Sequence, residues 1–114
     1  MKKIRTIVIC ALQVEGFHCW PDAPDDPEVA FLRDRHRHVF HIRMEFKVRH
    51  NDRAIEIIQM QNRVKRHQER IYGSPCEFGG RSCEDIATHL LKHYDAASVE
   101  VLEDGCGGAR VVRQ

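Results

Sequence analysis

The sequence predicts an α+β fold in which a mainly antiparallel sheet carries two helices on one face. Residues 40–48 alternate between apolar and polar side chains without a break, which is the pattern of a half-buried strand. Apolar residues recur at helical spacing through 57–71, and a second apolar helical pattern covers 82–94. Strand-like runs before and after these helices give the order β-β-β-α-α-β-β for a single domain, residues 1–114.

The composition is that of a globular protein with a hydrophobic core. Of the 114 residues, 42% are hydrophobic and 31% are charged, which excludes a disordered chain. The net charge of +1 excludes a broadly cationic protein that coats a nucleic acid polymer. The five cysteines form no C-x-x-C pair and leave an odd number, so we expect a reduced, cytosolic protein and no disulfide framework.

The first strand is expected over residues 4–17, where β-branched side chains are frequent. Its middle, 7–12, is apolar on both faces but too short to cross a membrane, and Gln13 follows at once. A strand that is apolar on both faces needs cover on both sides. Helices of the same chain can cover one side, so we expect a second subunit on the other and a homo-oligomer, from dimer to hexamer.

Turn-forming residues define the segments around the central strand. Residues 20–28 hold three prolines and four acidic residues, which predicts an irregular loop, and 29–32 is expected to be extended. The central strand ends at the Asn51-Asp52 turn, and a returning strand is expected over Arg53–Ile58. The polar face of the central strand is rich in arginine and histidine, so this face is either solvated or in contact with an anionic group.

The last third of the chain predicts a loop, a helix and two short strands. Residues 72–80 (YGSPCEFGG) read as a loop in which Phe78 stands among glycines. Ser82, with Asp85 three residues later, predicts the start of the second helix. Residues 99–102 then predict a strand, 103–105 a turn, and the two valines at 111–112 a final short strand.

Three histidines form the first candidate for a site. His36 and His38 lie on one face of a strand, because side chains two residues apart point the same way. His18, at the end of the first strand-like run, could approach them. Three histidines would make an open zinc site, whose fourth position is free for a substrate or a water. The alternative is three ordinary histidines at the edge of the core.

These histidines are also part of a resemblance. His18 after a β-rich run, His36-x-His38, and SCEDIATHLL followed by VEVLED resemble the layout of 6-pyruvoyl tetrahydropterin synthase and its relatives in queuosine biosynthesis. The resemblance spans nearly the whole chain and implies the T-fold, an antiparallel sheet backed by two helices and assembled into oligomeric barrels. It implies that the three histidines bind zinc and that Glu103 holds the edge of a heterocycle. The chain lacks the family's cysteine before His36 and its Asp-His pair after the first helix.

A second resemblance accounts for the loss of those catalytic groups. The strings HRHVFHI, HNDRAIE, SCEDIA and VLEDGCGGA are similar to small bacteriophage proteins, in particular the anti-Thoeris sponge family. Members of that family sequester a cyclised ADP-ribose immune signal without cleaving it, and some hold cyclic oligonucleotides in a second pocket. The resemblance implies a non-enzymatic protein without a cofactor, active in the cytoplasm of an infected bacterium.

The sponge resemblance implies its own set of ligand contacts. Arginine suits the pyrophosphate of a cyclic ADP-ribose because its planar guanidinium forms two parallel charge-assisted bonds. An aromatic ring suits the adenine, and side chains of the second helix would line the base pocket. A solvated surface is the alternative for each arginine, and ordinary packing is the alternative for the aromatic ring. The implied contacts are Arg53, Phe78, Ile86, Thr88 and Arg110.

The sequence therefore leads first to a phage protein that sequesters glyco-cyclic ADP-ribose or a similar cyclic nucleotide signal. The alternative is a zinc-dependent enzyme that resembles 6-pyruvoyl tetrahydropterin synthase, with the three histidines as zinc ligands and Glu103 at the heterocycle.

Overall fold

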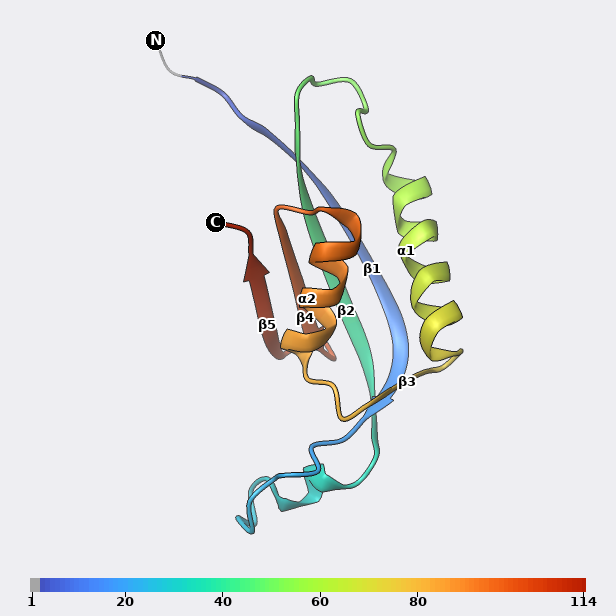
Figure 1. Cartoon of the computed structure of the whole chain (residues 1–114), viewed down its shortest axis with the longest axis vertical. Helices are drawn as coiled ribbons and strands as arrows, with labels where there is room; N and C mark the ends of the chain where they lie inside the picture. The colour runs from blue at the N-terminus through green and yellow to red at the C-terminus, as the bar shows by residue number, and fades with distance from the viewer. Residues whose placement is uncertain (1–2) are drawn as a thin grey trace.

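The computed structural model describes residues 3–114 and confirms the α+β class (Figure 1). Five strands form one sheet in the order β3-β1-β2-β4-β5. The sheet is mixed, because β3 runs parallel to β1 while the other neighbouring pairs are antiparallel. The elements are β1 (Thr6–His18), the 3-10 helix η1 (Ala30–Arg33), β2 (His36–Val48), α1 (Ile57–Tyr72), β3 (Cys76–Gly79), α2 (Cys83–Tyr94), β4 (Ser98–Glu103) and β5 (Gly107–Val112).

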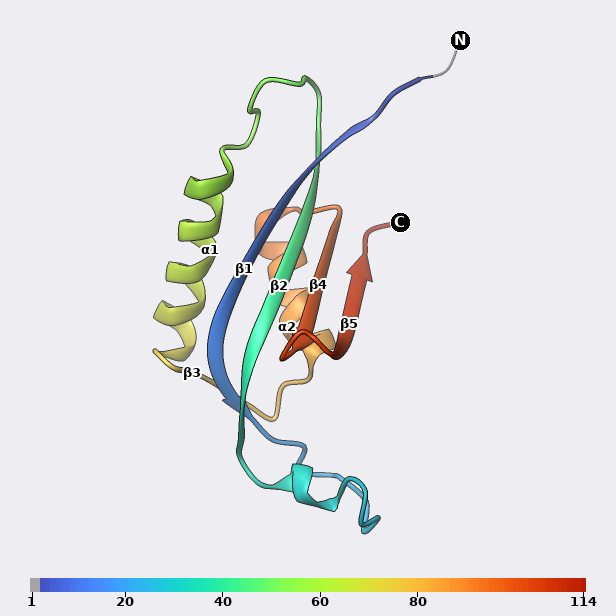
Figure 2. The ribbon, with the colours of Figure 1, turned by 180° about the vertical axis from the view of Figure 1, so that it is seen from behind.

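The two longest strands, β1 and β2, pair with each other inside the sheet. Its antiparallel register runs from Thr6 opposite Val48 to His18 opposite His36. Side chains alternate along both strands, so one face of the pair carries buried residues such as Cys10 and Phe40. The buried side chains of both helices join the same core, and Figure 2 shows the strands in front of α2. The two helices therefore cover one face of the sheet, as predicted.

Two predicted extended segments are wrong. Residues 29–32 were expected to be extended, but Ala30–Arg33 form the 3-10 helix η1, in which the Leu32 amide donates to the Val29 carbonyl and the Asp34 amide to the Phe31 carbonyl. The returning strand predicted over Arg53–Ile58 is absent from the described chain. Arg53 adopts a left-handed backbone with φ of 51°, and Ile57 and Ile58 already belong to α1. Helix α1 begins there instead, since the Glu56 carboxylate accepts hydrogen bonds from the first amides of the helix and acts as its N-cap.

The loop predicted over residues 72–80 contains the short strand β3. Gly16 of β1 lies opposite Cys76 of β3, and the missing side chain leaves room for Phe78. A Cβ atom on Gly16 would come within 2.6 Å of the Phe78 ring. The Phe78 ring lies 4.9 Å from the rings of both Phe40 and Tyr72, centroid to centroid, and is fully buried. Because β3 pairs with β1, Phe78 is buried in the core.

Helix α2 begins after Ser82, as the sequence predicted. The Ser82 hydroxyl accepts from the Asp85 amide, and the Asp85 carboxylate accepts from the Ser82 amide, which completes a capping box. Ile86, Leu90 and Leu91 are buried against the sheet, as predicted. Among residues 3–114, no helix is long and apolar enough to cross a lipid bilayer.

Gln68 of α1 is fully buried, and neither atom of its side-chain amide has a hydrogen-bond partner among the described residues. A buried polar group without a partner loses its hydration without compensation. We expect Gln68→Met, which keeps the unbranched shape, to raise the free energy of unfolding in urea by about 1–3 kcal/mol. The matched control is Gln59→Met on the exposed side of the same helix, which should change it little. Lower stability of Gln68→Met would contradict this account.

Candidate metal centre

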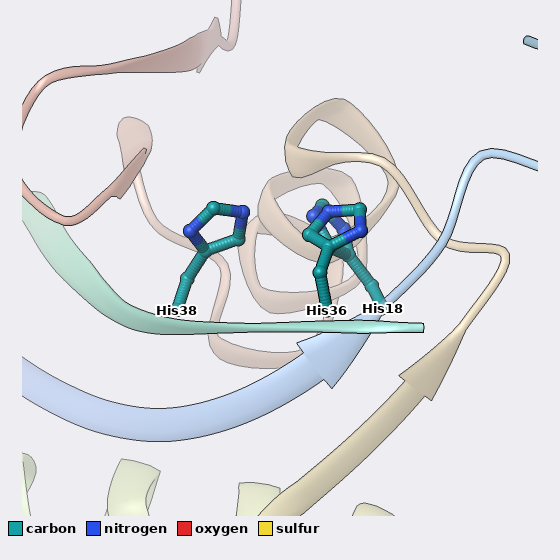
Figure 3. Close-up of side chains that lie close together, drawn as sticks. All are labelled: His18, His36 and His38. Carbon is teal, nitrogen blue, oxygen red and sulfur yellow. The ribbon is translucent and has the colours of Figure 1, made fainter. Parts of the chain in front are cut away.

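Three histidines meet where β1 ends and β2 begins. The β1–β2 register puts His18 opposite His36, and Gly16 opposite His38. Figure 3 shows the three rings rising on the same side of these strands. Their centroids are separated by 4.6 Å for His18 and His36, 5.2 Å for His18 and His38, and 5.0 Å for His36 and His38. One nitrogen from each ring lies within 4.8 Å of the others, so the predicted convergence of the histidines is confirmed.

Each of these rings has an oxygen atom beside its Nδ1. Nδ1 of His18 lies 3.0 Å from the Arg81 carbonyl oxygen, and Nδ1 of His36 lies 2.8 Å from that of Asp34. Nδ1 of His38 lies 2.7 Å from Oδ2 of Asp104. An oxygen that can only accept requires the proton on Nδ1, which leaves the lone pair on Nε2. This is the arrangement that orients histidine ligands around a metal.

The Nε2 lone pairs of two of these rings have no partner among residues 3–114. Nε2 of His18 and of His38 is buried and has no hydrogen-bond partner within the described part of the chain. Burial lowers the pKa of His18, and this effect exceeds the opposing ones of the Arg81 carbonyl and the Glu103 carboxylate. The neutral imidazole that results is the form that binds a metal ion.

Glu103, the last residue of β4, lies beside His18 and His38 and lines the same cavity. Its Oε2 lies 2.8 Å from Nε2 of His18 and 3.8 Å from Nε2 of His38, but without hydrogen-bond geometry. A carboxylate and two imidazole lone pairs therefore face one another, and a cation between them would relieve the repulsion. Cys83 lies beside this carboxylate, and burial, with the charge of Glu103, raises the pKa of the thiol to about 12. Cys83 therefore remains protonated.

A cavity of about 440 Å³ opens next to the histidines. This volume lies in the range of small-molecule sites. Trp20 stands at its wall with 46% of its surface exposed. The sequence pointed to His18, His36 and Glu103 in the wall of this cavity, but it offered no signal for Trp20 or for the turn before α2. The lining residues are His18, Cys19, Trp20, Leu32, His36, Gly80, Arg81, Ser82, Cys83, Glu84, Glu103 and Gly108.

None of the five contacts implied by the sponge resemblance lines this cavity. Phe78 and Ile86 are buried in the core. Arg53 lies in the loop after β2, at the far end of that strand from the histidines, and pairs with Asp52. Thr88 donates its hydroxyl to the Glu84 carbonyl within α2, and Arg110 of β5 pairs with Glu45 at 2.8 Å. The structure does not gather them into one pocket of a single chain.

Asp104 holds His38 in place. Its Oδ1 accepts from the Val39 amide at 2.9 Å while Oδ2 contacts the His38 ring, and these two bonds lower the pKa of the Asp104 carboxyl. Asp104→Asn keeps the left-handed backbone, which asparagine tolerates, but removes the charge. We expect about 10- to 100-fold weaker zinc binding, measured by competition with a chromophoric chelator. The exposed Asp52→Asn is the control, and equal affinity of the two variants would refute a supporting role for Asp104.

Comparison with models of known protein families and with functionally characterised proteins found no match to this chain.

Proposed function

We propose that the chain is a zinc-dependent protein of the type that the resemblance to 6-pyruvoyl tetrahydropterin synthase implies, and that it acts on a pterin-like heterocycle. The observation that carries the proposal is the set of oxygen partners at Nδ1 of His18, His36 and His38. These partners leave the Nε2 lone pair of each ring free for a metal ion, and one nitrogen of each ring lies within 4.8 Å of the others beside a cavity of ligand size.

The donor set fits zinc. Three neutral imidazoles are a common ligand set for catalytic zinc, and they leave a fourth position open. Bound zinc would polarise an oxygen of the substrate or lower the pKa of a bound water. The chain itself supplies the orientation of the imidazoles through Arg81, Asp34 and Asp104.

Glu103 and Trp20 suit a flat, nitrogen-rich ligand. An ionised carboxylate only accepts hydrogen bonds, so Glu103 would hold the N–H edge of a heterocycle. The indole of Trp20 at the cavity wall would pack against the ring face. The buried Cys83 thiol lies beside Glu103, and burial with the charge of Glu103 raises the pKa of the thiol to about 12.

The proposal includes the T-fold and its oligomers. Two long antiparallel strands with both helices on one face support the T-fold. Ile7 and Ile9 point to the other face of the sheet, and 36% and 42% of their surfaces are exposed in the single chain. A second copy of the chain would bury this apolar strip.

The chain carries its own reporter for a test, because Trp20 is its single tryptophan. Titration of zinc-loaded protein with neopterin should change the Trp20 fluorescence saturably, and the metal-free protein should respond more weakly. Glu103→Gln should weaken the response, while Glu100→Gln, three residues earlier on β4, should not. Mass spectrometry after incubation with a phosphorylated pterin would then show whether the chain turns the ligand over without the family's cysteine and Asp-His pair. Absence of a zinc-dependent response would overturn the proposal.

The sponge function stays a prediction of the sequence, together with its phage origin and its place in the host cytoplasm. The two functions can be distinguished by the ligand that the protein binds. A sponge would retain glyco-cyclic ADP-ribose through filtration and return it intact on heating, and it would do so without zinc. The geometry favours the zinc proposal, because the histidine centre is assembled within one chain and the five sponge contacts are not.

A further inference from the structure

His67 of α1 and His89 of α2 form a hydrogen bond between the two helices. Nε2 of His67 lies 2.9 Å from Nε2 of His89, and the planes of the two rings differ by only 10°. The hydrogen bond therefore lies in the plane of both rings. His93, one turn after His89, stacks on the face of the His67 ring with 4.0 Å between centroids. His67 is thus enclosed by α2, and only 4% of its surface is exposed.

The partners of His67 define where the protons of the pair lie. A guanidinium nitrogen of Arg70 lies 3.5 Å from Nδ1 of His67. A guanidinium only donates hydrogen bonds, so Nδ1 of His67 accepts and its proton lies on Nε2. That N–H group donates to Nε2 of His89, whose own proton lies on Nδ1. Both rings are neutral in this arrangement. A further proton on His89 would set two N–H groups face to face, and one on His67 would face the Arg70 guanidinium.

The groups around the pair are neutral or positive, and no carboxylate of residues 3–114 contributes to the pKa of either ring. The titratable groups that surround the pair are Arg63, Arg66, Arg70, Tyr72, Arg81, His93 and Tyr94. The acidic residues of the two helices lie elsewhere. Glu69 lines a groove beside β1 and β3, Glu84 lines the cavity beside the zinc site, and Asp85 caps α2. A proton that enters the pair therefore adds charge to a buried and already cationic environment.

We propose that the His67–His89 hydrogen bond is an acid-sensitive contact, which joins α1 to α2 at neutral pH and opens when the pair takes up protons. Burial first, and then the neighbouring imidazoles and the Arg70 guanidinium, lower the pKa of His67 to about 4. Burial is also the main cause that lowers the pKa of His89. When the helices separate, water reaches both rings and His67 regains its ordinary pKa of 6.5. Between pH 6.5 and about 4 the open state thus binds more protons, so a fall in pH favours opening.

The two helices lie over different parts of the sheet, so they can separate without breaking it. Helix α1 packs over β1 and β3, whereas α2 packs over β4 and β5. Within residues 3–114, one other hydrogen bond joins the helices, from the Tyr94 hydroxyl to the Arg63 carbonyl at 3.3 Å. Loss of the imidazole bond therefore removes half of the hydrogen bonds between α1 and α2, and the opening is confined to the helices.

Hydrogen exchange of the α1 backbone amides in the full-length protein, at pH 7.5 and at pH 5.0, tests the proposal. With a pKa of about 4 for His67 in the closed state and 6.5 in the open state, the equilibrium constant for opening should rise about 30-fold at pH 5.0. The α1 amides should lose protection by about that factor, after correction for the intrinsic effect of pH on exchange. Wild-type α1 amides that keep their full protection at pH 5.0 would overturn the proposal.

The matched variant is His67→Gln/His89→Gln, because two amides can share a hydrogen bond between the helices and neither titrates. This variant should keep the protection of α1 at pH 5.0. The control His41→Gln/His50→Gln changes two histidines outside the helices and should respond to acid as the wild type does. Because all three proteins are compared at the same pH, protonation of the zinc site affects them alike. An equal loss of protection in His67→Gln/His89→Gln and in the wild type would contradict the proposal.

Nitrogen NMR of the imidazole rings in the wild type needs no substitution. At pH 7.5 it should place the proton on Nε2 of His67 and on Nδ1 of His89. As the pH falls, protonation of His67 should coincide with the loss of protection in α1. A His67 ring that is fully protonated at pH 5.0 while α1 keeps its protection would show that the hydrogen bond does not control the contact.

Discussion

His36→Ala is expected to lower the zinc content of the purified protein from about one ion per chain to nearly none, because a three-histidine site then keeps two ligands. Loss of groups that only orient a ligand costs about 10- to 100-fold in metal affinity, so loss of the ligand itself should cost more than about 100-fold. Mass-spectrometric metal analysis after dialysis against a weak chelator measures the content.

The control for His36→Ala is His50→Ala, in the exposed loop after β2. His36 is half-buried at the start of β2, and circular dichroism should show that the variant keeps the wild-type fold. If His36→Ala protein that is folded still retained a full equivalent of zinc with wild-type affinity, His36 would not be a ligand.

Gly108→Ala is expected to lower the free energy of unfolding by about 3 kcal/mol, at the upper end of typical overpacking costs. Gly108 lies opposite Leu102 in the β4–β5 pair. A Cβ atom at this position would come within 1.9 Å of the Val101 carbonyl oxygen and 2.9 Å of the Leu102 Cα. Both are backbone atoms, so rotation of a side chain cannot relieve the clash, and the two strands must separate. Urea denaturation measures the loss.

Gly107→Ala is the matched control, because no atom of the described chain lies within 4 Å of the added Cβ. The two glycines are adjacent in β5, so a general preference for glycine in this strand would affect both variants alike. A similar loss of stability in both would show that the close approach at Gly108 is not the cause. The β4–β5 hairpin also carries Glu103 and Asp104, so Gly108→Ala should weaken zinc binding in addition.

The core and the histidine cluster could be predicted from periodicity. The alternation over residues 40–48 identified the central strand, and the two-residue spacing of His36 and His38 put both rings on one face. The strand begins at His36, as the placement of His36 and His38 on a strand predicted, four residues before the apolar alternation. His36 and His38, at the start of the strand, point to the site and not to the hydrophobic core, so the apolar alternation does not include them.

The partners of the histidines could not be predicted in the same way. His18 and His36 are oriented by the carbonyl oxygens of Arg81 and Asp34, and a carbonyl group carries no sequence signal. The short strand β3 was hidden because a proline and glycines border it and its partner, β1, is distant in sequence. Phe78 stood among glycines and suggested a ligand contact, but pairing of β3 with β1 buries it in the core.

The most direct test of the metal centre is the X-ray absorption spectrum of the zinc-loaded protein. Coordination through Nε2 of His18, His36 and His38 predicts three imidazole nitrogens at about 2.0–2.1 Å from zinc, with the rest of the shell made of oxygen. A sulfur atom at about 2.3 Å would contradict this, because it would place a cysteine such as Cys19 on the metal in place of a histidine.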